Sequence, residues 1–190
     1  MDTTKSLELN YLDNLPIQIV TENQNIKLLE LLLNDTTVDP TVNNQTPLKN
    51  AIKNNNLEMV TLLLKDPRID PSIDDNFCIR YASREGFTEM VDLLLTTGRV
   101  QPHADNNYCI QLACKNGHYD IVNLLLSQSM VDPSVCQNFA LRLACKMGFQ
   151  DIVERLLDDV RVNRLNLQNV YETCLFYKKI DLAYTVKQYL

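Results

Sequence analysis

The clearest feature of the sequence is a pattern of apolar and polar positions that repeats every 31 residues. Within each period, two short stretches place apolar residues three and four positions apart, which is the spacing of one face of an α-helix. The stretches that align in this way are 16–33, 47–64, 78–95, 109–126 and 140–157. A small or apolar residue marks one position of the pattern, at Val20, Ala51, Ala82, Ala113, Ala144 and Leu175. The pattern therefore predicts pairs of short helices that recur along the chain.

The stretch 108–126 illustrates how one period divides into two helices. Ile110 and Ala113 belong to a first apolar face, and Gly117 interrupts it with a residue suited to the left-handed geometry that ends a helix. Residues 119–126 then form a second apolar run at helical spacing. A polar connector follows in each period and carries Val-Asp-Pro or a variant of it, and proline there blocks continuation of the helix.

A period of this length indicates stacked units, because a single helix pair can bury its apolar side only against its neighbours. We therefore predict an all-α fold, a helix-turn-helix solenoid of about six repeats that forms a single domain. The predicted units are 14–44, 45–75, 76–106, 107–137, 138–168 and a C-terminal capping unit at 169–190. Residues 1–13 are expected to form an N-terminal cap or a flexible extension.

The unit resembles the ankyrin repeat, whose pattern runs Thr-Pro-Leu-His-x-Ala, then Gly-His, then Ile-Val-x-Leu-Leu-Leu. Residues 46–51 read Thr-Pro-Leu-Lys-Asn-Ala, 117–118 read Gly-His, and 121–126 read Ile-Val-Asn-Leu-Leu-Leu. The resemblance covers residues 14–190. Units of 31 residues with Val-Asp-Pro-Ser connectors are also similar to repeat arrays of giant DNA viruses and amoebae. The resemblance implies that the first helices line a concave surface and that the protein binds other proteins.

Two departures from that pattern lead to further expectations. Phe77, Tyr108 and Phe139 take the place of the usual threonine, and we expect these rings to pack between units rather than to cap a helix. In the last unit, the 31-residue step puts Leu175 in the series of small residues and Glu172 where a core leucine belongs. Atypical, more polar units at the ends of the array would act as caps.

The positions of the cysteine and histidine residues indicate a role in packing rather than in catalysis or metal binding. Cys78 and Cys109 are one period apart, as are Cys114 and Cys145, so buried thiols explain four of the six cysteines, and no Cys-x-x-Cys pair suggests a zinc site. His118 occupies the Gly-His position of the repeat. No nucleophile motif or phosphate-binding glycine loop occurs. We therefore expect no catalytic, metal-binding or cofactor-binding residues, and no enzyme activity or small-molecule substrate.

The composition and the first residues of the chain limit the partners and the cellular location that we expect. The formal charge of −6 gives the chain as a whole no attraction for nucleic acid or an anionic membrane. No apolar run is long enough to span a bilayer, and the first residues lack an apolar signal-peptide stretch. We expect an intracellular, cytoplasmic monomer, located in the host cytoplasm if the source is a virus.

The charges on the predicted first helices form a more specific pattern. Two positions four residues apart share a helix face in every unit. In units two to five, seven of these eight positions are cationic, with Gln111 as the exception: Lys49, Lys53, Arg80, Arg84, Lys115, Arg142 and Lys146. We expect this basic stripe to bind a protein with acidic or phosphorylated segments, because arginine holds carboxylate and phosphate groups well. The alternative is a solvated face with local ion pairs, such as Arg84 with Glu85.

Further contacts are expected beside the stripe. The predicted finger contacts are Asn76, Asp105, Asn107 and Asn138, with Met147 as an apolar anchor. Nucleic acid is not expected to bind, since the fingers carry acidic residues and few exposed aromatic residues are predicted for base stacking. An alternative function is an adaptor that recruits substrates to a larger complex such as a ubiquitin ligase, although no F-box-like segment follows the last repeat.

Overall fold

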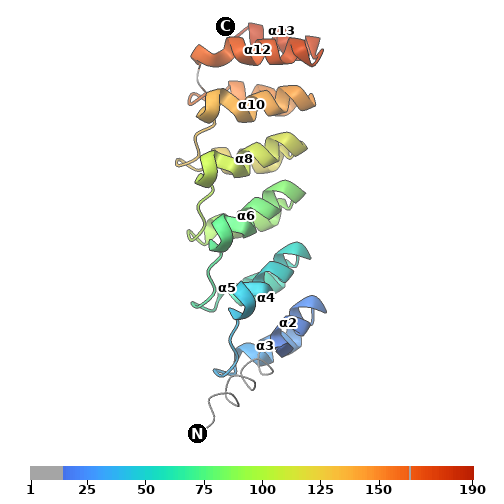
Figure 1. Cartoon of the computed structure of the whole chain (residues 1–190), viewed down its shortest axis with the longest axis vertical. Helices are drawn as coiled ribbons and strands as arrows, with labels where there is room; N and C mark the ends of the chain where they lie inside the picture. Colours follow the sequence, from blue (N-terminus) through green and yellow to red (C-terminus); the bar gives the residue numbers. More distant parts are fainter. Residues whose placement is uncertain (1–14, 163) are drawn as a thin grey trace.

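The computed structural model describes residues 15–162 and 164–190, and the predicted N-terminal cap or extension at 1–13 lies outside them. The described residues form twelve α-helices in six pairs, stacked in chain order (Figure 1). The first helices of the pairs are α2 (Leu15–Glu22), α4 (Val42–Lys53), α6 (Ile73–Glu85), α8 (Ala104–Asn116), α10 (Val135–Met147) and α12 (Leu167–Phe176). The second helices are α3 (Ile26–Leu33), α5 (Leu57–Leu64), α7 (Thr88–Thr96), α9 (Tyr119–Leu126), α11 (Gln150–Leu157) and α13 (Ile180–Lys187).

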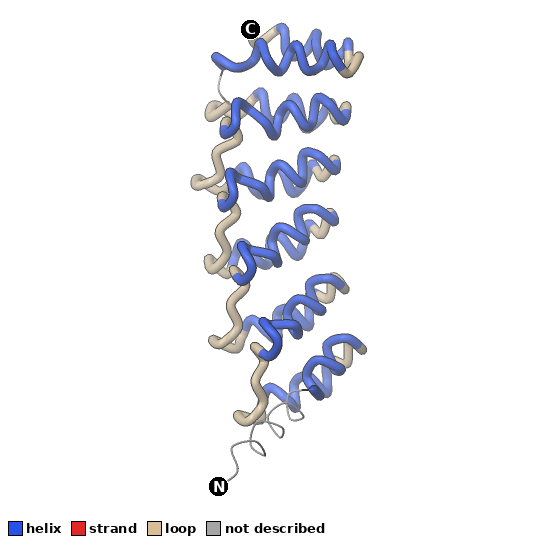
Figure 2. The backbone as a smooth tube through the Cα atoms, viewed as in Figure 1, coloured by secondary structure: helices blue, strands red, loops and turns tan. Residues whose placement is uncertain are grey.

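The arrangement of these elements confirms the predicted all-α solenoid. No strand occurs in the part of the chain that the structure describes, where the one further element is a short 3-10 turn, Arg164–Asn166 (Figure 2). The connectors from each second helix to the next first helix lie along one edge of the array (Figure 2). We call these connectors the fingers.

The hydrophobic core runs through the whole stack, between the two helices of each pair and between neighbouring pairs. First helices contact their neighbours more extensively than second helices do. The first helices carry small or short buried residues at one repeated position: Val20, Ala51, Ala82, Ala113, Ala144 and Cys174. Second helices contribute larger buried residues such as Met59, Met90 and Ile121, and each such side chain stabilises the fold by roughly 1.5–3 kcal/mol.

Glycine ends three of the first helices and makes a close contact with the following pair. Gly117 adopts a left-handed φ of 80°, and the next amide, of His118, donates to the carbonyl of Ala113 at 3.0 Å. The ring of Phe149, from the next pair, lies directly over Gly117. A Cβ atom there would stand 2.7 Å from two ring carbons, so the close packing of the two pairs requires glycine.

The last helix pair follows a different register from the one that the sequence predicts. The amide of Lys179 donates to the carbonyl of Cys174, as that of Phe149 does to Ala144 in the pair before. Cys174 therefore takes the small buried position, and the assignment of Leu175 to it is wrong by one residue, because this unit is one residue shorter. Leu175 and Glu172 are exposed.

The exposed surface of the last pair also differs from the polar cap that was expected. Phe176 is 78 % exposed, Tyr184 71 % and Ile180 61 %. These apolar side chains lie on α12 and α13 and near the turn between them. The last pair therefore presents more apolar surface to solvent than the sequence predicted.

Each of the middle four first helices has three consecutive residues in left-handed geometry directly after its first residue. They are asparagine or aspartate in most cases, which tolerate this geometry better than other side chains because they are short and polar. The third residue of each turn points inward. The oxygen of Asn107 accepts a hydrogen bond from the amide of Asp132 in the next finger at 3.0 Å, and Asn76 does the same for Gln101 at 2.7 Å.

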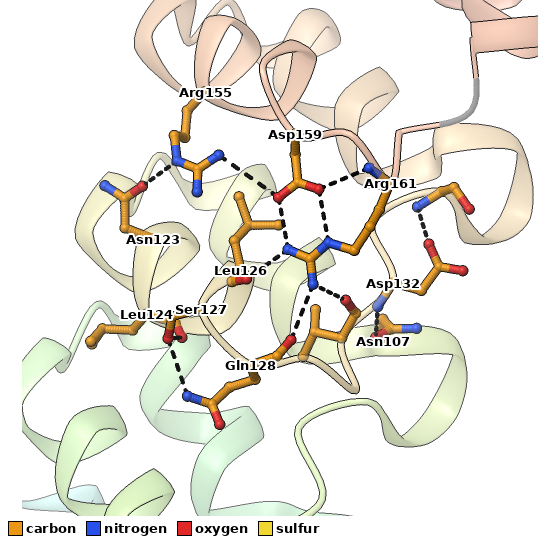
Figure 3. Close-up of polar contacts among 12 residues, drawn as sticks. Asn107, Asn123, Leu124, Leu126, Ser127, Gln128, Asp132, Arg155, Asp159 and Arg161 are labelled. Atoms are coloured by element: carbon orange, nitrogen blue, oxygen red, sulfur yellow. Dashed lines mark hydrogen bonds and ion pairs between the residues drawn. The ribbon is translucent and has the colours of Figure 1, made fainter.

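A second series of contacts, from arginine side chains, joins the fingers. The Arg161 guanidinium donates to the carbonyls of Leu126 and Gln128 at 2.6 and 3.1 Å (Figure 3). It also donates to the carbonyl of Val131 at 2.8 Å. Asp159 holds the same guanidinium through an ion pair of 2.7 Å. Arginines at 68 and 99 also donate to carbonyls of the preceding finger region. Sequence reasoning missed this series, although its members recur at multiples of 31 residues.

Candidate partner-binding face

The exposed side of the first helices, which we call the first-helix face, is built from positions at helical spacing. Positions i, i+3 and i+7 lie on one side of a helix. Position i forms an aromatic row of Phe77, Tyr108 and Phe139. Position i+3 forms a finger-side row of Lys49, Arg80, Gln111 and Arg142. Position i+7 forms a loop-side row, near the turn to the second helix, of Lys53, Arg84, Lys115 and Lys146. The predicted basic stripe thus consists of two distinct rows.

The finger-side row is occupied with holding the fingers in place. Arg80 donates to the backbone carbonyl of Asp74 and Arg142 to that of Cys136, both at 3.1 Å. Lys49 forms an ion pair with Asp74 of the next finger and keeps the pKa of that carboxyl below its usual value. These side chains are half-buried. Hydrogen bonds of a charged donor to carbonyls contribute about 1.5–3 kcal/mol each, so this row stabilises the left-handed turns.

The loop-side row is exposed and largely unpaired. Arg84 forms an ion pair with Glu85 at 2.7 Å, and its guanidinium lies 4.9 Å from the ring centre of Tyr81. Among the described residues, Lys53, Lys115 and Lys146 form no ion pair. This row supplies the cations of the stripe that a partner can reach.

Aromatic side chains are more exposed than the sequence predicted. Tyr108 is 38 % and Phe139 36 % exposed, so the expectation of few exposed aromatic residues is wrong. Phe77 is half-buried and packs against Tyr81 with ring centres 5.5 Å apart. Each ring comes directly after a left-handed turn that ends the finger. The finger therefore does not cover the outer edge of the ring, which stays in solvent.

Two shallow hollows follow the aromatic row. One, of about 170 Å³, is lined by Phe77, Arg80, Tyr81, Arg84, Tyr108 and Leu112. The next, of about 370 Å³, is lined by Asp105, Asn106, Tyr108, Gln111, Cys136 and Phe139. Both are surface depressions between neighbouring first helices, of a size that suits single side chains.

The predicted finger contacts are only partly available to a partner. Asn76, Asn107 and Asn138 are buried, and the first two hold the next finger through the hydrogen bonds described above. They are therefore structural residues, and the expectation that they lie exposed is corrected. Asp105 is exposed on its finger, and Met147 is 44 % exposed beside Lys146.

Acidic residues are concentrated on the opposite side of the pairs. Glu89, Asp92 and Asp120 line a hollow of about 430 Å³ between α7 and α9. Among the described residues, no group of three or more histidine, cysteine or acidic side chains is arranged to hold a metal ion. The hollow between α7 and α9 is thus acidic, whereas the loop-side row of the first helices is basic.

The cysteine side chains are packed into the interior with one exception. Cys78, Cys109, Cys114, Cys145 and Cys174 are buried, and Cys136 is exposed. Burial raises the pKa of Cys78 and of Cys109 to about 12. A thiol that stays protonated at neutral pH is a poor nucleophile and a poor metal ligand. The prediction that Cys78, Cys109, Cys114 and Cys145 are buried is confirmed.

Comparisons with known proteins agree with this geometry. The family model of ankyrin repeats (three copies) matches residues 3–75 and 79–166. A search of curated proteins found no match. In the described part of the chain, each helix is too short or too polar to cross a membrane. Ankyrin repeat domains are in general protein–protein interaction modules and are typically non-catalytic. Because the family model covers most of the sequence, the chain belongs to the ankyrin repeat family.

Proposed function

We propose that this chain is a non-catalytic module that holds a protein partner through an acidic or phosphorylated segment bound on its first-helix face. The observation that carries the proposal is the loop-side row, which gives one exposed cation on each of four successive first helices. Lysine and arginine head groups donate hydrogen bonds to carboxylate and phosphate oxygens. In a chain with a net charge of −6, this row concentrates cations on one face and gives that face an attraction for anions.

The fingers limit where an anionic segment would lie on this face. Asp74 and Asp105 are exposed at the finger edge, next to the finger-side row. Like charges at that edge repel an acidic segment, whereas the loop-side row lies farther from the fingers along each helix. The segment is therefore expected over the loop-side row, with neighbouring side chains in the hollows of the aromatic row.

The stability of the fold does not explain why the loop-side row is cationic. Exposed ion pairs contribute roughly 0–1 kcal/mol to folding, and Lys115 has no ion pair among the described residues. Exposed charges at an interface act mainly on the rate of association and on the choice of partner. Binding by this face should therefore weaken as salt is added.

Charge reversal on the loop-side row tests the proposal. We would immobilise the wild-type chain, a variant with Lys53→Glu, Lys115→Glu and Lys146→Glu, and a control with Lys27→Glu, Lys65→Glu and Lys187→Glu. The control lysines are exposed and lie on or next to second helices, so both variants carry the same change of net charge. Circular dichroism would show that each variant keeps its helix content.

The proteins captured from a lysate would then be compared by mass spectrometry. We expect a set of acidic or phosphorylated proteins to be retained by the wild type and by the control and lost by the loop-side variant. Phosphatase treatment of the lysate separates the two kinds of anion. Recovery of the same proteins by all three chains would show that the loop-side row does not bind the partner.

A further inference from the structure

The loop-side row has a spacing that selects the shape of the bound segment. Its cations recur every 31 residues and so occupy one equivalent position on each of four successive helix pairs. The axes of packed neighbouring helices lie about 8–10 Å apart. A chain in the polyproline II conformation has three residues per turn and advances ~3.1 Å per residue, so one turn covers about 9.3 Å. Every third side chain of such a segment would face the next cation.

Other backbone conformations fit the row less well. In a β-strand, side chains alternate between two faces, so residues three apart point in opposite directions. A partner strand also needs an open sheet edge, and the described part of the chain contains only helices and their connectors. A partner helix is about 10–12 Å wide, and its body would extend over the finger-side row toward Asp74 and Asp105. A polyproline II segment needs no hydrogen-bond partner for its backbone and is narrower.

Aromatic rings hold three of the four cations in place. The Lys53 ammonium lies 5.9 Å from the ring centre of Phe77, and that of Lys146 lies 5.1 Å from Tyr177, each ring belonging to the next helix pair. The Arg84 guanidinium lies 4.9 Å from the ring centre of Tyr81 on its own helix and is also paired with Glu85. Side chains that are already positioned lose less conformational freedom when they bind, which favours a ligand with matching spacing.

The row ends in an apolar residue. Because the last pair follows a 30-residue step, the position equivalent to Lys146 is Phe176 rather than Tyr177. Phe176 is 78 % exposed and packs edge-on against Tyr177, with ring centres 5.0 Å apart. Met147, also exposed, lies beside Lys146 in the sequence. The next step along a bound segment therefore meets apolar surface.

Building on the proposed function, we infer that the partner segment is an acidic stretch in the polyproline II conformation with a fixed spacing. Four anionic side chains, each three residues from the next, face the cations Lys53, Arg84, Lys115 and Lys146. One step beyond the anion at Lys146, an apolar side chain packs on Phe176. A bound segment that runs in either direction along the row has the same spacing of anions. The apolar residue therefore lies at the N-terminal or at the C-terminal end of the acidic stretch, depending on that direction.

Synthetic peptides test this spacing on the full chain. Fluorescein-labelled peptides would carry four glutamates, each three residues from the next, and a leucine three residues beyond the last glutamate. Glycine and serine would fill the positions between. One peptide would have the leucine at the C-terminal end of the glutamates and a second would have it at the N-terminal end. Respaced peptides of identical composition would carry the glutamates at every second position. Fluorescence anisotropy at low salt should show binding of one evenly spaced peptide about tenfold tighter than its respaced form, because respacing leaves part of the row unmatched. A phosphoserine series would give the same order.

A charge exchange assigns the contact at one residue. Lys115→Glu should weaken binding of the evenly spaced peptide, and a peptide with lysine two steps from the leucine should restore it. Lys65→Glu, an exposed site at the end of α5, serves as the control and should change neither affinity. Restoration by lysine at any other step would contradict the spacing.

The remaining outcomes separate this inference from the proposed function. Equal affinity for evenly spaced and respaced peptides would overturn the spacing and leave acidic-segment binding in place. If no acidic peptide binds while charge reversal still removes captured proteins, the extended segment is wrong and the proposed function stands. Tighter binding of a single-stranded oligonucleotide of equal charge than of any peptide would overturn both.

Discussion

Replacement of Gly117 by alanine should destabilise the array more than the same change at Gly98. Both glycines have left-handed backbone geometry, with φ of 80° and 64°. Alanine in this geometry costs about 1–2 kcal/mol at either site. At Gly117 the added Cβ would also stand 2.7 Å from two ring carbons of Phe149, whereas at Gly98 no atom lies within 4 Å. Forced overpacking of this kind costs about 1–3 kcal/mol.

The expected loss in free energy of unfolding is therefore about 2–5 kcal/mol for Gly117→Ala and about 1–2 kcal/mol for Gly98→Ala. Urea titration followed by circular dichroism would measure both values. In a background with Phe149→Ala, the effect of Gly117→Ala should fall to that of Gly98→Ala, because the ring that the methyl group meets is gone. Equal losses at the two glycines in the wild-type background would refute the argument that the ring contact requires glycine.

Three further predictions follow from other contacts. Asn107→Ala should lower the free energy of unfolding by about 0.5–1.5 kcal/mol, because the amide of Asp132 loses its acceptor, whereas Asn107→Gln should cost less, since Gln45 performs the same role for the amide of Asp70. Arg161 lowers the pKa of Asp159, so this pair should stabilise the protein at pH values above the unfolded pKa of about 3.9. That stabilisation should be lost as the pH falls below about 4. The urea midpoint should therefore fall less steeply with decreasing pH in Asp159→Asn than in the wild type. Cys136 should react with Ellman's reagent within seconds in the native protein, the five buried cysteines should react slowly, and equal rates for all six would contradict the burial.

The sequence was sufficient to predict the helix pairs and their stacking, because both depend on apolar periodicity. The register of the last pair was not predictable from that periodicity. Leu175 and Cys174 are adjacent and both suit a core position, and the choice depends on the stretch between Val162 and Cys174, which is one residue shorter than its counterpart in the pair before. The hydrogen bonds of the turn between α12 and α13, which the apolar pattern does not encode, decide which of the two residues is buried.

The candidate site was predictable in its charges and not in its accessibility. Arg80 and Arg84 are alike in sequence, yet the first is fixed to a finger carbonyl and the second is exposed, since they differ in distance from the left-handed turn. An asparagine in a polar connector is equally compatible with solvent and with a buried hydrogen bond, so the role of Asn107 was missed. The arginine series that includes Arg161 is interrupted by Met130, which obscured its period.

The hydrogen bonds between fingers have a direction along the chain. The acceptor Gln45 precedes its donor, the amide of Asp70, by 25 residues, and the acceptors in the following two pairs also precede their donors by 25 residues. A ribosome releases the acceptor before the donor, so each new pair emerges next to a preformed template. Each acceptor and its donor belong to the same 31-residue unit, so trimming whole units from either side deprives no remaining finger amide of its acceptor in this series. Each of these units thus fastens its own finger, whichever unit lies next to it.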